Sequence, residues 1–158
     1  GEWDDMGLLQ AHAFVNEGDK TMIWYSHWDT GLKLRNMAIG LATLRRDGFG
    51  YFSRMYDQET AHFVTTSFET EAGNSLALNI DGVNDDAPII VELLDELDRP
   101  VLGFSGADAA KITTNGIKQR VFWPKTMSDL LPVGKKIAIK VTFPNNSQGK
   151  LYALYILN

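Results

Sequence analysis

The segment Lys136–Phe143 alternates between two kinds of side chain with a period of two residues. Ile137, Ile139, Val141 and Phe143 occupy one set of positions, and Lys136, Ala138, Lys140 and Thr142 occupy the other. Because successive side chains of a β-strand point to opposite faces, this pattern predicts a strand with one face in a core and the other toward water.

Shorter runs with the same character recur along the chain, separated by turns rich in Gly, Asn, Asp and Pro. They are Thr21–Trp28, Met37–Leu44, His62–Phe68, Ser75–Ile80, Lys118–Trp123 and Leu151–Leu157. Many short strands with closely spaced turn signals are typical of sandwiches and jelly rolls. We therefore predict an all-β fold: a β-sandwich of jelly-roll or concanavalin-like type, with mostly antiparallel strands and little helix.

Two segments fit more than one local structure. Ile89–Leu97 also satisfies helical spacing, but Pro100 cannot donate to a ladder and favours extended geometry at Arg99. We therefore predict a strand to about Asp95, followed by a turn. The second segment, Gly106–Lys111, could form one short helical turn. Neither choice changes the fold class.

The composition narrows the classes of partner. With 158 residues the chain is long enough for one domain with a sizeable core. Its formal net charge is −5 and its Lys and Arg residues are dispersed, which argues against a nucleic-acid or anionic-membrane partner. The absence of cysteine excludes disulfides and thiolate metal sites, and no apolar run has the length of a spanning helix.

A series of short motifs adds a family resemblance. The segment Ala38–Phe49 ends a strand pattern in the charged turn Arg45-Arg46-Asp47. It is followed in order by Phe63–Thr70, Leu76–Ile80, Val91–Asp95, Arg99–Ser105, Val121–Trp123, Gly134–Lys136 and Lys150–Ala153. Over residues 35–158 the chain resembles the C-terminal β-sandwich domain, carbohydrate-binding-module-like, of five-bladed β-propeller glycoside hydrolase-like proteins. The resemblance implies turn closure and ion pairing for Arg45, Arg46 and Asp47, and a core position for Trp123.

The same resemblance sets the expected organisation. We predict a single β-sandwich domain over residues 1–158, with residues 31–158 as the sandwich proper. Residues 1–30 resemble the last propeller blade, and we predict that they form a hairpin added to the sandwich, with its turn at Asn16–Asp19. The alternative is a propeller divided between chains and completed in trans. Because the chain begins at Gly1 and the family is often exported, we expect an excised or processed product with an extracytoplasmic location.

Aromatic residues are the best candidates for a binding site. Trp24, Tyr25, His27 and Trp28 stand in one strand-like run, followed by Asp29 and Arg35, and a second candidate surface contains Tyr51 and Tyr56. Alternation places Trp24 and Trp28 on one face of the strand and Tyr25 and His27 on the other. Exposed rings bind the flat apolar faces of sugars, and nearby polar side chains bind the hydroxyl groups. The competing interpretation is that these rings pack a core or a propeller interface.

Metal and catalytic chemistry have less support. Asp81, Asn84, Asp85 and Asp86 form an oxygen-rich cluster that could hold a structural calcium ion, but we favour a turn stabilised by its own hydrogen bonds. The three histidines lack the spacing of a zinc site. No two carboxylates have a spacing that pairs them as glycosidase acid and nucleophile, so we assign no catalytic residue and no cofactor.

We therefore expect a non-catalytic domain that binds a polysaccharide or oligosaccharide and assists polysaccharide degradation. One alternative is a purely structural domain that braces a catalytic glycoside hydrolase propeller. Another is a fragment of a glycosidase whose catalytic residues lie outside this chain. The structural alternative predicts an apolar patch around residues 1–28 and Arg45-Arg46. No nucleic-acid or membrane partner is expected.

Overall fold

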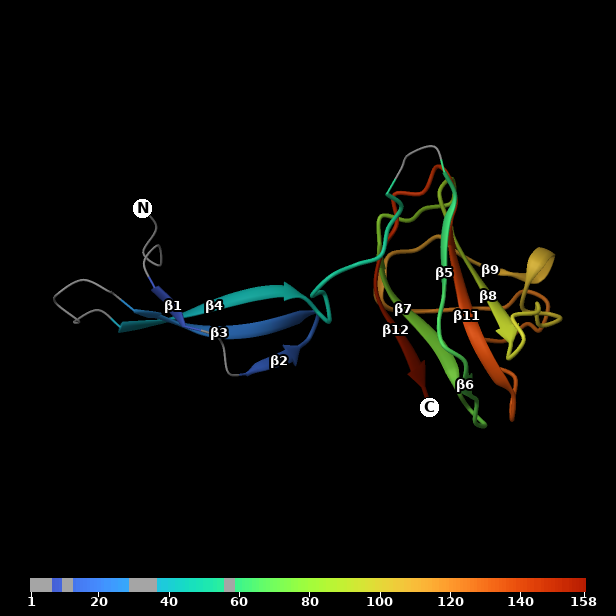
Figure 1. Cartoon of the computed structure of the whole chain (residues 1–158), viewed down its shortest axis with the longest axis horizontal. Coiled ribbons are helices and arrows are strands. Elements are labelled where there is room, and N and C mark those ends of the chain that lie inside the picture. Colours follow the sequence, from blue (N-terminus) through green and yellow to red (C-terminus); the bar gives the residue numbers. More distant parts are fainter. Residues whose placement is uncertain (1–6, 10–12, 29–36, 56–58) are drawn as a thin grey trace. The chain divides into compact units, whose positions relative to one another are not determined.

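The chain divides into two compact units, Gly1–Phe49 and Gly50–Asn158. The computed structural model describes residues 7–9, 13–28, 37–55 and 59–158. The regular secondary structure of the described residues is almost entirely β-strand, in antiparallel sheets, so the predicted all-β class is confirmed (Figure 1). The boundary after Phe49 differs from the predicted one after residue 30.

The N-terminal unit is one four-stranded antiparallel sheet. Its strands are β1 (Gly7–Leu9), β2 (Phe14–Glu17), β3 (Lys20–Trp28) and β4 (Met37–Arg45). The strand β4 pairs with the whole length of β3, whereas β2 pairs with its first half and β1 with its last three residues. Both therefore share the second edge of β3, which is the central strand of the sheet.

This pairing confirms one prediction and corrects another. The hairpin turn predicted at Asn16–Asp19 is present, because Asn16 pairs with Thr21 and Glu17 with Lys20. However, Met37–Arg45 does not belong to the sandwich proper as predicted. It completes the N-terminal sheet, since its backbone takes the free edge of β3.

The charged turn after β4 is tied to the β2–β3 hairpin. The Arg46 side chain donates to the carbonyl oxygen of Gly18 (3.0 Å) and lies 3.7 Å from the Asp47 carboxylate. Asp47 has a positive φ of 54° and accepts a hydrogen bond from the Asn16 amide at 2.7 Å. Its own N–H donates to the Thr21 hydroxyl at 2.9 Å. Turn closure and ion pairing by Arg46 and Asp47 are thus confirmed.

The C-terminal unit is a sandwich of two antiparallel sheets, seen as two layers in Figure 1. One sheet has the order β10 (Gly116–Arg120), β7 (Ser75–Asp81), β12 (Lys150–Leu157). The other has the order β5 (Ala61–Val64), β11 (Lys136–Phe143), β8 (Ile89–Asp95), β9 (Ala110–Ile112), with β6 (Phe68–Glu69) also paired to β11. A single turn of 3₁₀ helix, η1 (Gly106–Asp108), precedes β9.

The core lies between these two sheets, and the residues of Lys136–Phe143 that were predicted to face inward, Ile137, Ile139, Val141 and Phe143, are all buried in it. Leu76, Leu78 and Ile80 of β7 are fully buried in one cluster with inward residues of β8 and β11. Trp123 is also fully buried, with its ring edge-to-face on Phe104 at a centroid distance of 5.2 Å, so its predicted core position is confirmed. The strand predicted through Asp95 is confirmed as β8, and in the segment Gly106–Lys111, where the sequence left the local structure open, the helical turn is η1. In the described part of the chain, no helix has the length and hydropathy needed to cross a membrane.

Candidate functional site

One face of the N-terminal sheet collects apolar side chains. The β-ladder places Trp24 opposite Leu41, Ser26 opposite Ile39, and Met22 opposite both Val15 and Thr43. Cross-strand partners share a face, so Val15, Met22, Trp24, Ile39 and Leu41 lie together. We call this set the apolar face.

The apolar face is open to solvent. Trp24 is 43% exposed and Ile39 is 76% exposed, while Val15 and Leu41 are exposed to a similar degree as Trp24. A shallow hollow of about 250 Å³ lies beside Trp24 and is lined by Ala13, Tyr25, Ser26 and Ile39. The described residues of this unit form only this one sheet, and they provide no second layer that covers the face.

The opposite face of the same sheet holds Tyr25 and His27. A Cβ atom added at Gly40, the cross-strand partner of Tyr25, would lie only 2.2–2.7 Å from atoms of the tyrosine ring. The ring therefore lies over Gly40, and the missing side chain makes room for it. His27 is only 6% exposed. The predicted alternation is confirmed, and it separates the histidine from the exposed Trp24 ring.

The other predicted members of the aromatic site fall outside what is described. Asp29, Arg35 and Tyr56 lie outside the described residues, and the side chain of Trp28 is not described either. The part of the predicted site that can be placed is therefore a tryptophan with apolar neighbours on one face, and a tyrosine with a buried histidine on the other.

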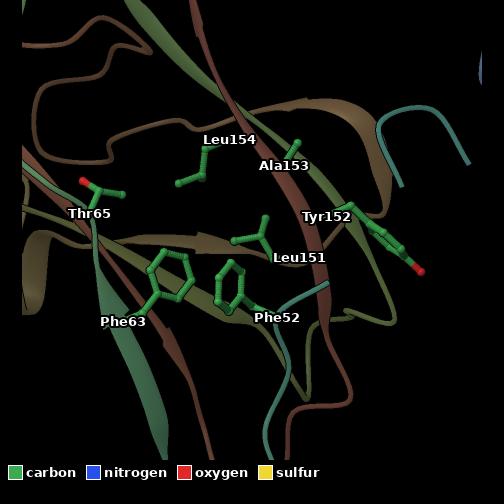
Figure 2. A pocket seen from close by; sticks show the side chains of 7 residues that line it. All are labelled: Phe52, Phe63, Thr65, Leu151, Tyr152, Ala153 and Leu154. Carbon is green, nitrogen blue, oxygen red and sulfur yellow. The ribbon is translucent and has the colours of Figure 1, made fainter. Parts of the chain in front are cut away.

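The sandwich has a hollow of its own, at the edge where its two sheets end. It measures about 410 Å³ and is lined by Phe52, Phe63, Thr65, Leu151, Tyr152, Ala153 and Leu154. Figure 2 shows the rings of Phe52 and Phe63 beside Leu151 and Leu154, with Thr65 at the margin and the Tyr152 ring directed away. Phe63 and Leu154 come from β5 and β12, the edge strands of the two sheets. The lining suits an apolar group better than the hydroxyl groups of a sugar.

Tyr51 lies beside this hollow and is 53% exposed. Its ring meets the Tyr152 ring edge-to-face at a centroid distance of 5.6 Å. The ammonium group of Lys150 lies 5.3 Å from the centre of the Tyr51 ring, within reach of a cation–π interaction. Of the two tyrosines in the second predicted surface, Tyr51 is the one the structure describes, and it is an exposed ring with a cation beside it.

The predicted oxygen-rich cluster is a hydrogen-bonded turn. The side-chain oxygen of Asn84 accepts from the backbone N–H groups of Asp86 (3.0 Å) and Ala87 (2.9 Å). This is the interaction expected of an Asn/Asp turn. Within the residues that the structure describes, no group of three or more His, Asp or Glu side chains is placed to hold a metal ion.

The principal charged cluster of the sandwich lies on the β8 and β11 strands. The Glu92 carboxylate accepts from the Lys140 ammonium and from the backbone N–H of Gly106, each at 2.9 Å. Partial burial raises the pKa of Glu92, but these two hydrogen bonds and the positive charge of Lys140 outweigh it and hold the pKa below its ordinary value. An ionised, paired glutamate of this kind fixes the η1 loop against the sheet.

The hollow in the sandwich is the feature that sequence reasoning missed. Period-two alternation in β5 indicates that Phe63 faces inward, but it does not tell which strand lies opposite. Phe52 lies at this hollow because it forms an isolated antiparallel bridge with Leu151. The spacing along the sequence gives no signal of that contact.

Comparison with family models, with curated protein sequences and with solved structures finds no match for this chain.

Proposed function

We propose that this chain is a non-catalytic accessory domain that braces a glycoside hydrolase propeller, with the apolar face of its N-terminal sheet as the docking surface. The observation that carries the proposal is the set of exposed apolar side chains around Trp24. The family resemblance of residues 35–158 supplies the kind of partner: an antiparallel β-sheet of a propeller blade.

The physical reason is the cost of leaving one sheet uncovered. A sheet with an apolar face is stable when a second layer covers that face, and contiguous exposed apolar side chains usually mark an interface. Burying a side chain such as Leu41 or Ile39 contributes about 1.5–3 kcal/mol each. A propeller blade presents a surface of the required kind, because its strands also alternate apolar and polar side chains.

Among the described residues, the apolar face lacks the polar groups that a sugar site needs, and this also favours docking of a protein surface. A sugar site needs hydrogen-bonding side chains around its aromatic ring. The described neighbours of Trp24 on its face are mainly aliphatic, and His27 lies on the other face. Stacking of a sugar on Trp24 is therefore less well supported than docking of a protein surface.

The test uses Leu41→Thr, which places a β-branched residue that favours strands at this position but removes the apolar side chain. We expect the unmodified chain, whose docking face has no partner, to self-associate reversibly in sedimentation velocity runs. It should also bind a five-bladed glycoside hydrolase propeller stripped of its own sandwich domain. Leu41→Thr should weaken both by about tenfold or more, since a loss of 1.4 kcal/mol is a factor of ten.

Leu102→Thr is the matched control, because Leu102 is 93% exposed on a loop of the sandwich. It should leave both associations unchanged. A chain that stays monomeric at high concentration and does not bind the propeller would contradict the proposal. Equal losses of affinity in the two variants would contradict it as well.

A second candidate function, carbohydrate binding, rests on Tyr51 rather than on Trp24. Its exposed ring beside Lys150 offers a stacking platform with a hydrogen-bond donor next to it. Affinity electrophoresis against neutral and acidic polysaccharides tests it with Tyr51→Ala, and with Phe122→Ala as an equally exposed aromatic control. Retardation that only Tyr51→Ala abolishes would support sugar binding, and no retardation across the panel would rule it out.

The proposal includes an extracytoplasmic location, because polysaccharide-degrading enzymes act on polymers outside the cell. The family resemblance alone supports this part.

A further inference from the structure

The last residues of the N-terminal unit contact other residues of that unit. The N–H of Gly48 donates to the carbonyl oxygen of Arg45 at 2.8 Å, which closes the turn after β4. The Phe49 ring then packs edge-to-face on the Phe14 ring, with a centroid distance of 5.2 Å. Hydrogen bonding and ring packing therefore anchor the chain to the N-terminal sheet as far as Phe49.

The first residues of the C-terminal unit likewise contact residues of the sandwich. Phe52 and Leu151 exchange two backbone hydrogen bonds of 2.8 and 2.9 Å, and the Phe52 ring stacks on Phe63 at 4.7 Å. One residue earlier, Tyr51 packs on Tyr152. The anchoring on this side therefore begins at Tyr51.

Gly50 is the one residue between these two sets of anchors. A Cβ atom added there would meet no other atom within 4 Å, and its φ lies outside the left-handed region that favours glycine. Neither a close approach nor a special backbone angle explains the glycine. What glycine does supply is access to about twice the φ range of other residues.

We propose that Gly50 is a single-residue hinge between the two compact units. Rotation about its two backbone dihedrals changes the direction of the chain, while Phe49 and Tyr51 keep their packing on their own units. Hinges of this kind are a few positions at the ends of elements that absorb the change in backbone angles. The inference goes beyond the bracing function: it lets the sandwich change direction while the N-terminal sheet stays docked.

The chain suits a spin-label distance measurement, because it has no cysteine of its own. One label at Asp19→Cys and one at Lys111→Cys report on the two units, since both positions are exposed and lie within one unit each. All samples also carry Leu41→Thr, so that docking through the apolar face does not influence the distances. The measured quantity is the width of the distance distribution from pulsed electron resonance.

We expect a broad distribution when residue 50 is glycine. Gly50→Val should narrow it roughly twofold and Gly50→Ala by less, because a β-branched side chain removes most of the φ range that glycine adds. The Cβ atom that both substitutions add meets open space. The matched control is Gly116→Val within the sandwich, where an added Cβ lies 3.4–3.6 Å from Gln119. It should leave the width unchanged.

Three results would overturn the hinge: a narrow distribution with Gly50 present, no narrowing in Gly50→Val, or equal narrowing in Gly116→Val. None of them bears on the docking proposal, because these samples measure the link between the units and not binding through the apolar face.

Discussion

Replacement of Gly40 has a local effect, because the Tyr25 ring takes the space where a side chain at this position would be. We predict that Gly40→Ala destabilises the N-terminal sheet by about 1–3 kcal/mol, the usual cost of forcing an extra carbon into a packed site. Hydrogen exchange of the β3 amides measures the loss.

The control is the same change in a Tyr25→Ala background, where the ring is absent. Gly40→Ala should cost much less there, and the difference between the two backgrounds is the coupling between the residues. Equal losses in both backgrounds would show that the contact between Tyr25 and Gly40 does not matter for stability.

Trp123 is a second residue whose substitution should change stability. The side chain is fully buried, and its indole N–H has no hydrogen-bond partner within the described residues. Trp123→Ala should cost about 3–5 kcal/mol of sandwich stability in urea denaturation. Trp123→Phe should cost clearly less, because it removes an unpaired buried donor together with part of the ring. Equal losses for the two variants would contradict this prediction.

These two residues also show how far sequence reasoning reaches. The burial of Trp123 follows from the family resemblance and from its place at the end of an alternating strand. The contact of Tyr25 with Gly40 depends on the register between β3 and β4, and residue types alone do not fix that register. Alternation predicts that Tyr25 and His27 lie on the opposite face of the sheet from Trp24, but it does not predict that His27 is buried.

At the scale of elements, the ion pair between β8 and β11 makes stability depend on pH. The pKa of Glu92 is held below its ordinary value of 4.5, so the ionised form stabilises the folded state above that value. This stabilisation is lost as the pH falls through the lowered pKa. We predict that Glu92→Gln destabilises the sandwich near neutral pH and that the gap to the unmodified protein closes on acidification.

Urea denaturation at a series of pH values measures that gap. Glu96→Gln, an exposed glutamate just after β8, is the matched control and should show little difference at any pH. A gap for Glu92→Gln that stays constant through the acidic range would refute the assignment.

Strand prediction worked where alternation is continuous and failed where a side chain replaces the backbone. Lys136–Phe143 is a strand with the predicted bounds. The run predicted over His62–Phe68 is instead split into β5 and β6. At the break, the Thr65 hydroxyl accepts the hydrogen bond of the Ile139 N–H at 3.0 Å, in place of a main-chain oxygen. Period-two patterning does not reveal such a substitution, because Thr65 fits the pattern of a strand.

At the scale of the whole molecule, two compact units predict two folding transitions. We expect a chain of residues 50–158 to fold by itself, because its core cluster lies entirely within that unit. Its amide spectrum should overlay the sandwich resonances of the full chain, and urea denaturation of the full chain should show a separate transition for the N-terminal sheet. A single transition for the full chain, with an unfolded 50–158 fragment, would contradict the division.

The boundary between the units was beyond sequence reasoning for a specific reason. Both sides of Phe49 have strand character, and no Pro- or Ser-rich linker marks the change. Only the pairing of β4 with β3 assigns residues 37–45 to the first unit. The fold class, in contrast, follows from local alternation that holds in either arrangement.

The pairing of β7 with β12 has a consequence for how the protein is made. These neighbours join Ser75–Asp81 to Lys150–Leu157, with β8, β9, β10 and β11 between them in sequence. During synthesis, β7 cannot pair with β12 until residues 150–157 have left the ribosome. Until then, the edge of β7 that pairs with β12 stays uncovered. Non-local pairing of this kind slows folding and lengthens exposure to aggregation. We therefore expect chaperones to matter most for this protein while the sandwich is still being synthesised.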